Sequence, residues 1–151
     1  MNLSLNLTFE PKRINMKKLS IILFASLAFT ACSNNKKQEK DLLNNILKVH
    51  DKVMAKDEAL MKNKMALDSL LKLPAKDTAE KTNMKALELK LKAAEESMET
   101  WMQKFDPDVT NKPHDEIVKY YDDQKKAIMS VDSLMNTAVD ESTKYLSSRS
   151  K

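Results

Sequence analysis

The sequence of 151 residues contains no glycine, although a chain of this length carries about ten at average usage. Phosphate-binding loops, dinucleotide-binding turns and the nucleophile elbow of α/β-hydrolases all need glycine, so each of them is excluded. One cysteine and two histidines are too few for an ordinary zinc site. The sequence therefore predicts a protein that is not an enzyme, with no catalytic residues and no cofactor.

A targeting signal begins at Met16. Two lysines precede an apolar run over residues 19–29, and small residues follow it, as in a signal peptide. The run has 11 residues, whereas a membrane-spanning helix needs about 20. A buried core helix is the alternative, but such helices rarely lie between a lysine pair and a small-residue site. We therefore predict a signal peptide over residues 16–31, with residues 1–15 as an upstream extension rather than an unusually long positive region.

The segment Phe29-Thr30-Ala31-Cys32 resembles the bacterial lipobox, with Phe29 where the pattern usually has an aliphatic residue. The resemblance implies cleavage before Cys32 and attachment of a diacylglycerol and an N-acyl chain to it. Several acyl chains anchor a protein stably to a membrane. Basic residues Lys36 and Lys37 follow, where similar lipoproteins that reach the cell surface carry acidic ones. We thus expect a cell-envelope lipoprotein on the outer membrane, facing the periplasm.

The net charge gives no sign of a nucleic-acid partner. Residues 1–32 hold four of the 26 basic and one of the 22 acidic residues, so the net charge falls from +4 to +1 without them. Basic and acidic residues are interspersed in the remainder, without the basic patch that nucleic-acid binding requires.

The rest of the chain has helical periodicity and no strand alternation. Residues 32–40 are predicted to be the lipidated cysteine and a polar tether, and residues 148–151 a tail. The expected helices are 41–73, 78–105 and 112–146. Asp77 and Glu80 form a capping box for the second helix, and Thr110 or Asn111 caps the third. Short connections predict an all-α, antiparallel up-down-up three-helix bundle over residues 41–147, coiled-coil-like in character.

Each predicted helix carries an apolar stripe that should face the core. The stripes are Leu42, Ile46, Val49, Val53, Leu60, Leu67 and Leu70; then Met84, Leu87, Leu91, Ala94, Met98, Trp101 and Phe105; then Ile117, Tyr120, Tyr121, Ala127, Ile128, Val131, Leu134, Met135, Ala138 and Tyr145. Leu47, Met54 and Met61 should widen the first stripe. Polar interruptions, which either set the register of the bundle or form a partner groove, are Lys56, Asn63 and Gln124.

Two groups of residues are candidate sites. In an antiparallel bundle, residues of different helices that lie at the same height along the bundle axis are neighbours. Matching heights in this way places four aromatic residues near residues 42–46, at the tether end: Trp101, Phe105, Tyr120 and Tyr121. They are candidates for binding a protein partner, although Trp101 should face the core against Ile46, Tyr120 or Tyr121. The second group would bind Cu(I), which favours thioether and imidazole ligands: His50, Met54 and Met98, with Met61 and Met102 nearby. The alternative is that these methionines simply fill the core.

Three segments behind the lipobox, residues 42–54, 98–105 and 120–128, together resemble small bacterial lipoproteins labelled "viral A-type inclusion protein". The likeness extends over the chain after Cys32, and its most distinctive element is Trp101-Met102-Gln103-Lys104-Phe105. It implies a coiled-coil-like fold, and these lipoproteins have no assigned activity that could be transferred to this chain. The prediction is thus a lipid-anchored envelope protein of structural or protein-interaction type, attached to the membrane through Cys32 and contacting an unknown protein partner. The alternative is a periplasmic module that binds Cu(I) or a small ligand.

Overall fold

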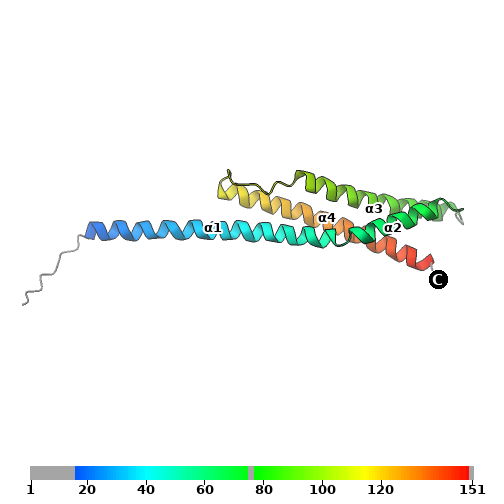
Figure 1. Ribbon diagram of the computed structural model, residues 1–151, viewed down its shortest axis with the longest axis horizontal. Helices are drawn as coiled ribbons and strands as arrows, with labels where there is room; N and C mark the ends of the chain where they lie inside the picture. The colour runs from blue at the N-terminus through cyan, green and yellow to red at the C-terminus, as the bar shows by residue number, and fades with distance from the viewer. Residues whose placement is uncertain (1–15, 75–76, 150–151) are drawn as a thin grey trace, which may run out of the picture. The chain divides into compact units, whose positions relative to one another are not determined.

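The computed structural model describes the backbone of residues 16–74 and 77–149, and the side chains from residue 34 onward within those ranges. Four helices make up the described chain: α1 (Met16–Met54), α2 (Asp57–Leu71), α3 (Thr78–Lys104) and α4 (His114–Arg149) (Figure 1). This part of the chain has no strand, so the predicted all-α class is confirmed. Residues 1–15 and the side chain of Cys32, and with them the predicted extension and lipidation site, lie outside the described part.

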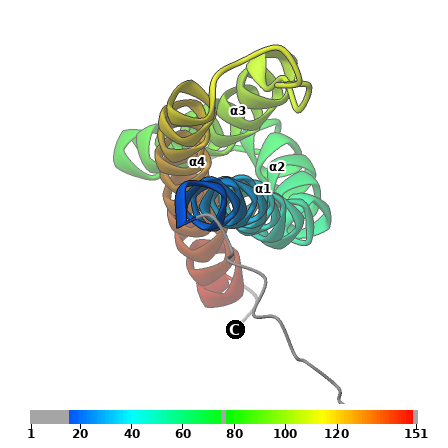
Figure 2. The ribbon, with the colours of Figure 1, turned by 90° about the vertical axis from the view of Figure 1, so that its left-hand side faces the viewer.

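The chain divides into two compact units, Met1–Lys37 and Gln38–Lys151, and the helical bundle is the second. Its helices α2, α3 and α4 all pack against one another, as Figure 2 shows in a view along them. None of the helices in the described part combines the length and the apolar character that crossing a bilayer requires.

Cross-helix hydrogen bonds and ion pairs define the helix directions in the bundle. The pairs are Lys52–Asp132 at 2.7 Å, Asn63–Ser142 at 2.8 Å, Lys64–Glu95 at 2.5 Å and Lys90–Glu141 at 2.5 Å. Residue numbers rise together between α1–α2 and α4, so these helices run parallel. Between α3 and its neighbours, the residue numbers rise in one helix as they fall in the other, so α3 is antiparallel to both. This is the predicted up-down-up arrangement.

The expected first helix over 41–73 is interrupted by a turn at Ala55 and Lys56. The N–H of Lys56 donates to the carbonyl of Val53 at 2.9 Å, which closes a tighter turn than an α-helix has. Lys56 occupies a position of the apolar stripe, and its Nζ donates to the side chain of Asn136 on α4. The turn thus lies at the position where an uninterrupted helix would place the ammonium group of Lys56 in the core.

A column of four fully buried side chains runs through α1 and α2 at a spacing of seven residues: Ile46, Val53, Leu60 and Leu67. The expected widening of this stripe was wrong. Leu47, Met54 and Met61 are 38–41% exposed, because α3 and α4 cover only a narrow face of the first helices.

The second apolar stripe is confirmed from Met84 to Trp101, and most of the third stripe is buried as well. Ala127 and Leu134 were expected in the core but are exposed, whereas Val139 and Ser142 are buried instead. The buried face of α4 therefore turns toward α2 near its C-terminal end, where Ser142 meets Asn63.

Helix ends in this chain form without glycine. The carboxylate of Asp77 accepts the N–H of Glu80 at 2.7 Å, as the capping box predicted. At the end of α3, Phe105 is extended, with φ −76° and ψ 118°. No described residue has a positive φ, so none of these ends uses the left-handed cap for which glycine is favoured.

Several predicted boundaries differ from the structure; α4, for example, continues to Arg149, so residues 148 and 149 of the expected tail are helical. Residues 33–40 are helical rather than an irregular tether, because they contain good helix formers and no proline. Glu39 then reaches His114, with 2.7 Å between Oε1 and Nδ1. At the other end, α4 begins at His114, and the carbonyl of Pro113 accepts the N–H groups of Glu116 and Ile117 at 3.0 Å. Neither Thr110 nor Asn111 is therefore the first residue before the helix.

Asn63 is the main polar residue in the core, with 6% of its surface exposed. Its Nδ2 donates to the hydroxyls of Ser142 and Thr143 at 2.8 Å, and more weakly to the carbonyl of Val139 at 3.3 Å. The sequence left two roles open for Asn63, a register-setting residue or part of a partner groove. The structure supports the first, because these hydrogen bonds fix the register between α2 and α4.

We expect Asn63→Ala to lower the free energy of unfolding by about 1–3 kcal/mol, because the hydrogen bonds to α4 are lost inside the core. Chemical denaturation followed by helical circular dichroism measures this change. Asn44→Ala is the matched control, since Asn44 is exposed on α1 and gains the same helix propensity. Equal stability of the two variants would contradict the role of the buried polar layer.

Candidate functional site

Rings from α1, α3 and α4 gather at the end of the bundle where Gln38 begins the compact unit. The ring of Trp101 stacks on that of Phe105 with centroids 4.8 Å apart, and the ring of His50 lies 5.9 Å from Trp101. Phe105 in turn faces Tyr120 at 6.4 Å, and Tyr120 touches Tyr121 at 5.7 Å. We call these five residues the aromatic cluster; the height matching placed the four predicted aromatics at the correct end.

The two tyrosines hold the loop between α3 and α4. The hydroxyl of Tyr120 accepts the N–H of Asp106 at 2.8 Å, and that of Tyr121 donates to the carbonyl of Pro107 at 3.4 Å. Burial raises the pKa of Tyr121 above its ordinary value, so its hydroxyl remains a donor at a higher pH than that of an exposed tyrosine. Two side chains of α4, the helix that follows the loop, therefore hold the loop in place by hydrogen bonds.

Acidic side chains fold this loop from within. Asp106 Oδ1 accepts the N–H of Asp108 at 2.9 Å. Asp108 Oδ1 in turn accepts the hydroxyl and the N–H of Thr110 at 2.7 and 3.1 Å. These two hydrogen bonds, first that of the hydroxyl, lower the pKa of Asp108. The loop carboxylates are thus engaged in turn formation, which the sequence pattern had not indicated.

The prediction that Trp101 faces the core is confirmed, because only 6% of its surface is exposed. Tyr121 is buried too, at 2%, while Phe105 and Tyr120 are half-buried. Ring contacts of Trp101 are with His50 and Phe105 rather than directly with either tyrosine. The ring of Phe105, the residue at which α3 ends, lies between the rings of Trp101 and Tyr120.

The candidate Cu(I) ligands differ widely in accessibility. His50 is half-buried, Met54 is 40% exposed, and Met98 is buried at 4%. The Nδ1 of His50 lies 3.0 Å from the carboxylate of Asp51, which leaves Nε2 for another partner. In the described part of the chain, no three His, Cys, Asp or Glu side chains are arranged to hold a metal ion.

Seven carboxylates of α1, α2 and α4 lie on the surface. All seven are exposed: Asp51, Asp57, Glu58, Asp115, Glu116, Asp122 and Asp123. The pKa of Asp123 is lowered by its hydrogen bond from Lys119 at 3.2 Å, as in an ordinary surface ion pair. General acid–base catalysis needs a carboxyl group held near a reacting atom. These side chains are placed instead to interact with solvent and with neighbouring lysines.

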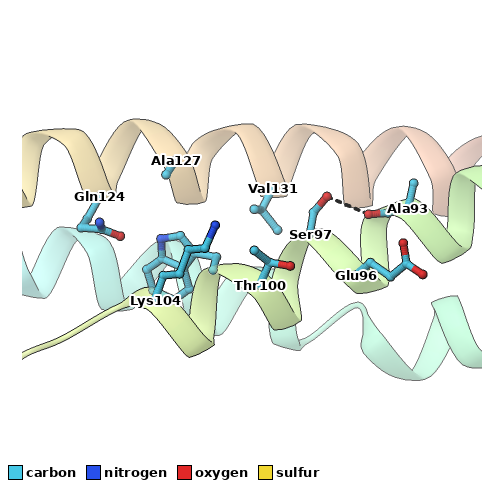
Figure 3. Close-up of a pocket in the computed structure, with 9 residues that line it drawn as sticks. Ala93, Glu96, Ser97, Thr100, Lys104, Gln124, Ala127 and Val131 are labelled. Carbon is cyan, nitrogen blue, oxygen red and sulfur yellow. Dashed lines mark hydrogen bonds between the residues drawn. The ribbon is translucent and has the colours of Figure 1, made fainter.

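A groove of about 550 Å³ lies beside the aromatic cluster, between α3 and α4 (Figure 3). Its lining residues are Ala93, Glu96, Ser97, Thr100, Trp101, Lys104, Gln124, Ala127 and Val131. Figure 3 shows Ala127, Val131 and Gln124 of α4 facing Thr100 and Lys104 of α3. Two buried polar atoms of this lining have no hydrogen-bond partner: Nε1 of Trp101 and Oε1 of Gln124.

A partner groove at Gln124 was one of the two alternatives that the sequence left open, but its position between α3 and α4 was not predicted. The available signal was the polar residue Gln124 in an otherwise apolar stripe, together with the small residue Ala127 three positions further along α4. A third unpartnered atom, Oδ1 of Asp132, lies outside the groove on a carboxylate that already binds Lys52. The orphaned pair at Trp101 and Gln124 is therefore the feature of the bundle surface that most suggests a ligand.

No family model, curated protein or solved structure matches the chain.

Trp101→Ala should lower the free energy of unfolding by about 3–5 kcal/mol, because it empties a packed position in the aromatic cluster. In the full chain in mild detergent, emission from this single tryptophan should be blue-shifted and should shift to the red together with the loss of helical circular dichroism. Thr100→Ala, at an exposed neighbouring position, is the control and should change stability little. Near-normal stability of Trp101→Ala, with emission typical of water, would make the aromatic cluster an open binding surface instead.

Proposed function

We propose that this protein is a lipid-anchored component of the bacterial cell envelope, held on the periplasmic face of the outer membrane through Cys32. Its helical bundle serves as a non-enzymatic structural and protein-binding module. The proposal rests on the lipobox-like segment Phe29-Thr30-Ala31-Cys32 and on the position of the folded unit that follows it.

The position of the unit boundary is the observation that carries this proposal. The compact unit starts at Gln38, six residues after Cys32 in the sequence. Cleavage before Cys32 would therefore remove only residues of the first unit. The described hydrogen bonds, ion pairs and ring contacts of the bundle begin at Glu39 and would all remain.

The surface of the bundle supports an interaction role better than a catalytic one. Its cross-helix ion pairs, such as Lys64–Glu95 and Lys90–Glu141, join charges of opposite sign on adjacent helices. A hydrogen bond from Lys64 to Glu95 raises the pKa of the lysine, as expected for a stable pair. The charged residues thus fix the helices to one another, and the α3–α4 groove beside Trp101 is left for a partner.

Cys32→Ser should abolish acylation, because the serine hydroxyl cannot form the thioether on which the anchor depends. Cells fed labelled palmitate should label the wild-type protein, and the variant should accumulate uncleaved or in the wrong compartment. Ser33→Ala, one residue further along, should be labelled normally. Equal labelling of the wild type and Cys32→Ser would show that the anchor is assigned wrongly.

Cu(I) binding by His50, Met54 and Met98 is a second proposal. The observation in its favour is the contact between His50 Nδ1 and Asp51, since a carboxylate commonly orients a metal-binding histidine in this way. Stoichiometric Cu(I) under reducing conditions should then raise the melting temperature of the protein. The increase should vanish in the double variant His50→Ala/Met54→Leu and persist in Met129→Leu, whose exposed side chain lies on α4. No shift in the wild type would remove this proposal.

A further inference from the structure

The two unpartnered atoms of the α3–α4 groove form a complementary pair. Nε1 of Trp101 is a hydrogen-bond donor, Oε1 of Gln124 is an acceptor, and both atoms are buried. Leaving a buried polar group without a partner costs about 1–3 kcal/mol. A ligand that offers one acceptor and one donor would recover much of this cost. A peptide group has this combination, with one carbonyl and one N–H.

Charged side chains along the groove would orient a bound peptide. Lys104 and Glu96 both line it and are exposed. They lie eight residues apart on α3, or about 12 Å along the helix. Three residues of extended peptide span about 10–11 Å. A short peptide can therefore place a carboxylate near Lys104 and an ammonium group near Glu96 while one of its amides lies beside Trp101.

The neighbouring side chains leave the two charges available. Glu96 is 3.6 Å from Lys92, but both side chains are 61% exposed, and such pairs contribute little. The hydroxyl of Ser97 is already bound to the carbonyl of Ala93 at 2.7 Å, so that part of the groove presents no free donor (Figure 3). Specific recognition thus depends on four residues: Glu96, Trp101, Lys104 and Gln124.

We propose that the α3–α4 groove binds a short extended peptide segment. Trp101 donates to a peptide carbonyl and Gln124 accepts a peptide N–H, while Lys104 and Glu96 face an acidic and a basic group at its two ends. This inference deepens the interaction part of the proposed function by naming the class of partner. It does not depend on lipidation of Cys32.

The test uses trialanine with free termini as the probe, added to the full ¹⁵N-labelled chain in mild detergent. Trp101 is the only tryptophan, so its indole N–H gives a single NMR resonance that reports directly on the groove. Binding should shift this resonance downfield in a saturable way, because the N–H gains an acceptor. Trialanine amide and N-acetyl-trialanine should each bind more weakly, since each lacks one of the charged ends.

Two variants and their controls test the assignment of residues. Gln124→Ala should weaken binding of trialanine about three- to tenfold, the effect of one uncharged hydrogen bond. Gln103→Ala, an exposed glutamine on α3 outside the groove, should not. Lys104→Ala should weaken binding of trialanine but hardly change that of its amide, whereas Lys85→Ala should affect neither.

A resonance that shows no saturable shift, or a shift that does not depend on the peptide termini and on Gln124, would overturn the inference and leave a groove that holds water only. The peptide series on the unmodified chain keeps the test decisive even where a variant loses structure. Palmitate labelling of Cys32 is measured separately. Labelled protein that binds no peptide would therefore refute this inference alone, and unlabelled protein that binds peptide would refute only the anchor.

Discussion

The bundle depends on a column of four side chains that are spaced seven residues apart and lose all contact with solvent: Ile46, Val53, Leu60 and Leu67. The seven-residue repeat keeps one narrow face of the first two helices turned toward α3 and α4. The turn at Ala55 and Lys56 does not disturb this spacing, since Val53 and Leu60 lie on either side of it. Burial of this kind is the main favourable term in folding, and the polar contacts are arranged around it.

Much of the fold follows from the local sequence pattern. The remaining parts, which the pattern does not predict, share one cause. The stripe from Met84 to Trp101 and the cap at Asp77 depend on spacing and on side-chain chemistry within a few residues, so the sequence predicts them. Exposure of Leu47 and Met61 depends instead on how much of a helix its neighbours cover, which is a tertiary property. The turn at Lys56 is also of this kind, since its hydrogen-bond partner is 80 residues away.

The candidate site was predictable only in part, for the same reason. Height matching placed Trp101 and Phe105 at the correct end of the bundle, because up-down-up topology relates positions on different helices by simple counting. Counting does not give side-chain direction. The indole nitrogen of Trp101 and the amide oxygen of Gln124 come to line one groove through the relative rotation of α3 and α4. In the sequence, this arrangement is indicated only by a polar residue within an apolar stripe and a small residue beside it.

The continuous helix α1 has a consequence for the chain after the proposed cleavage. A cut before Cys32 would create a new helix N-terminus there, with Lys36 and Lys37 in its first two turns and no acidic residue before Glu39. Positive charges near this end oppose the helix dipole, although Ser33, Asn34 and Asn35 are residue types that can cap the first amides. The turns nearest the lipid should therefore unwind as far as the contact between Glu39 and His114. Processing itself would then leave a flexible connection between the lipid and the bundle, and the contact between Glu39 and His114 would set its length.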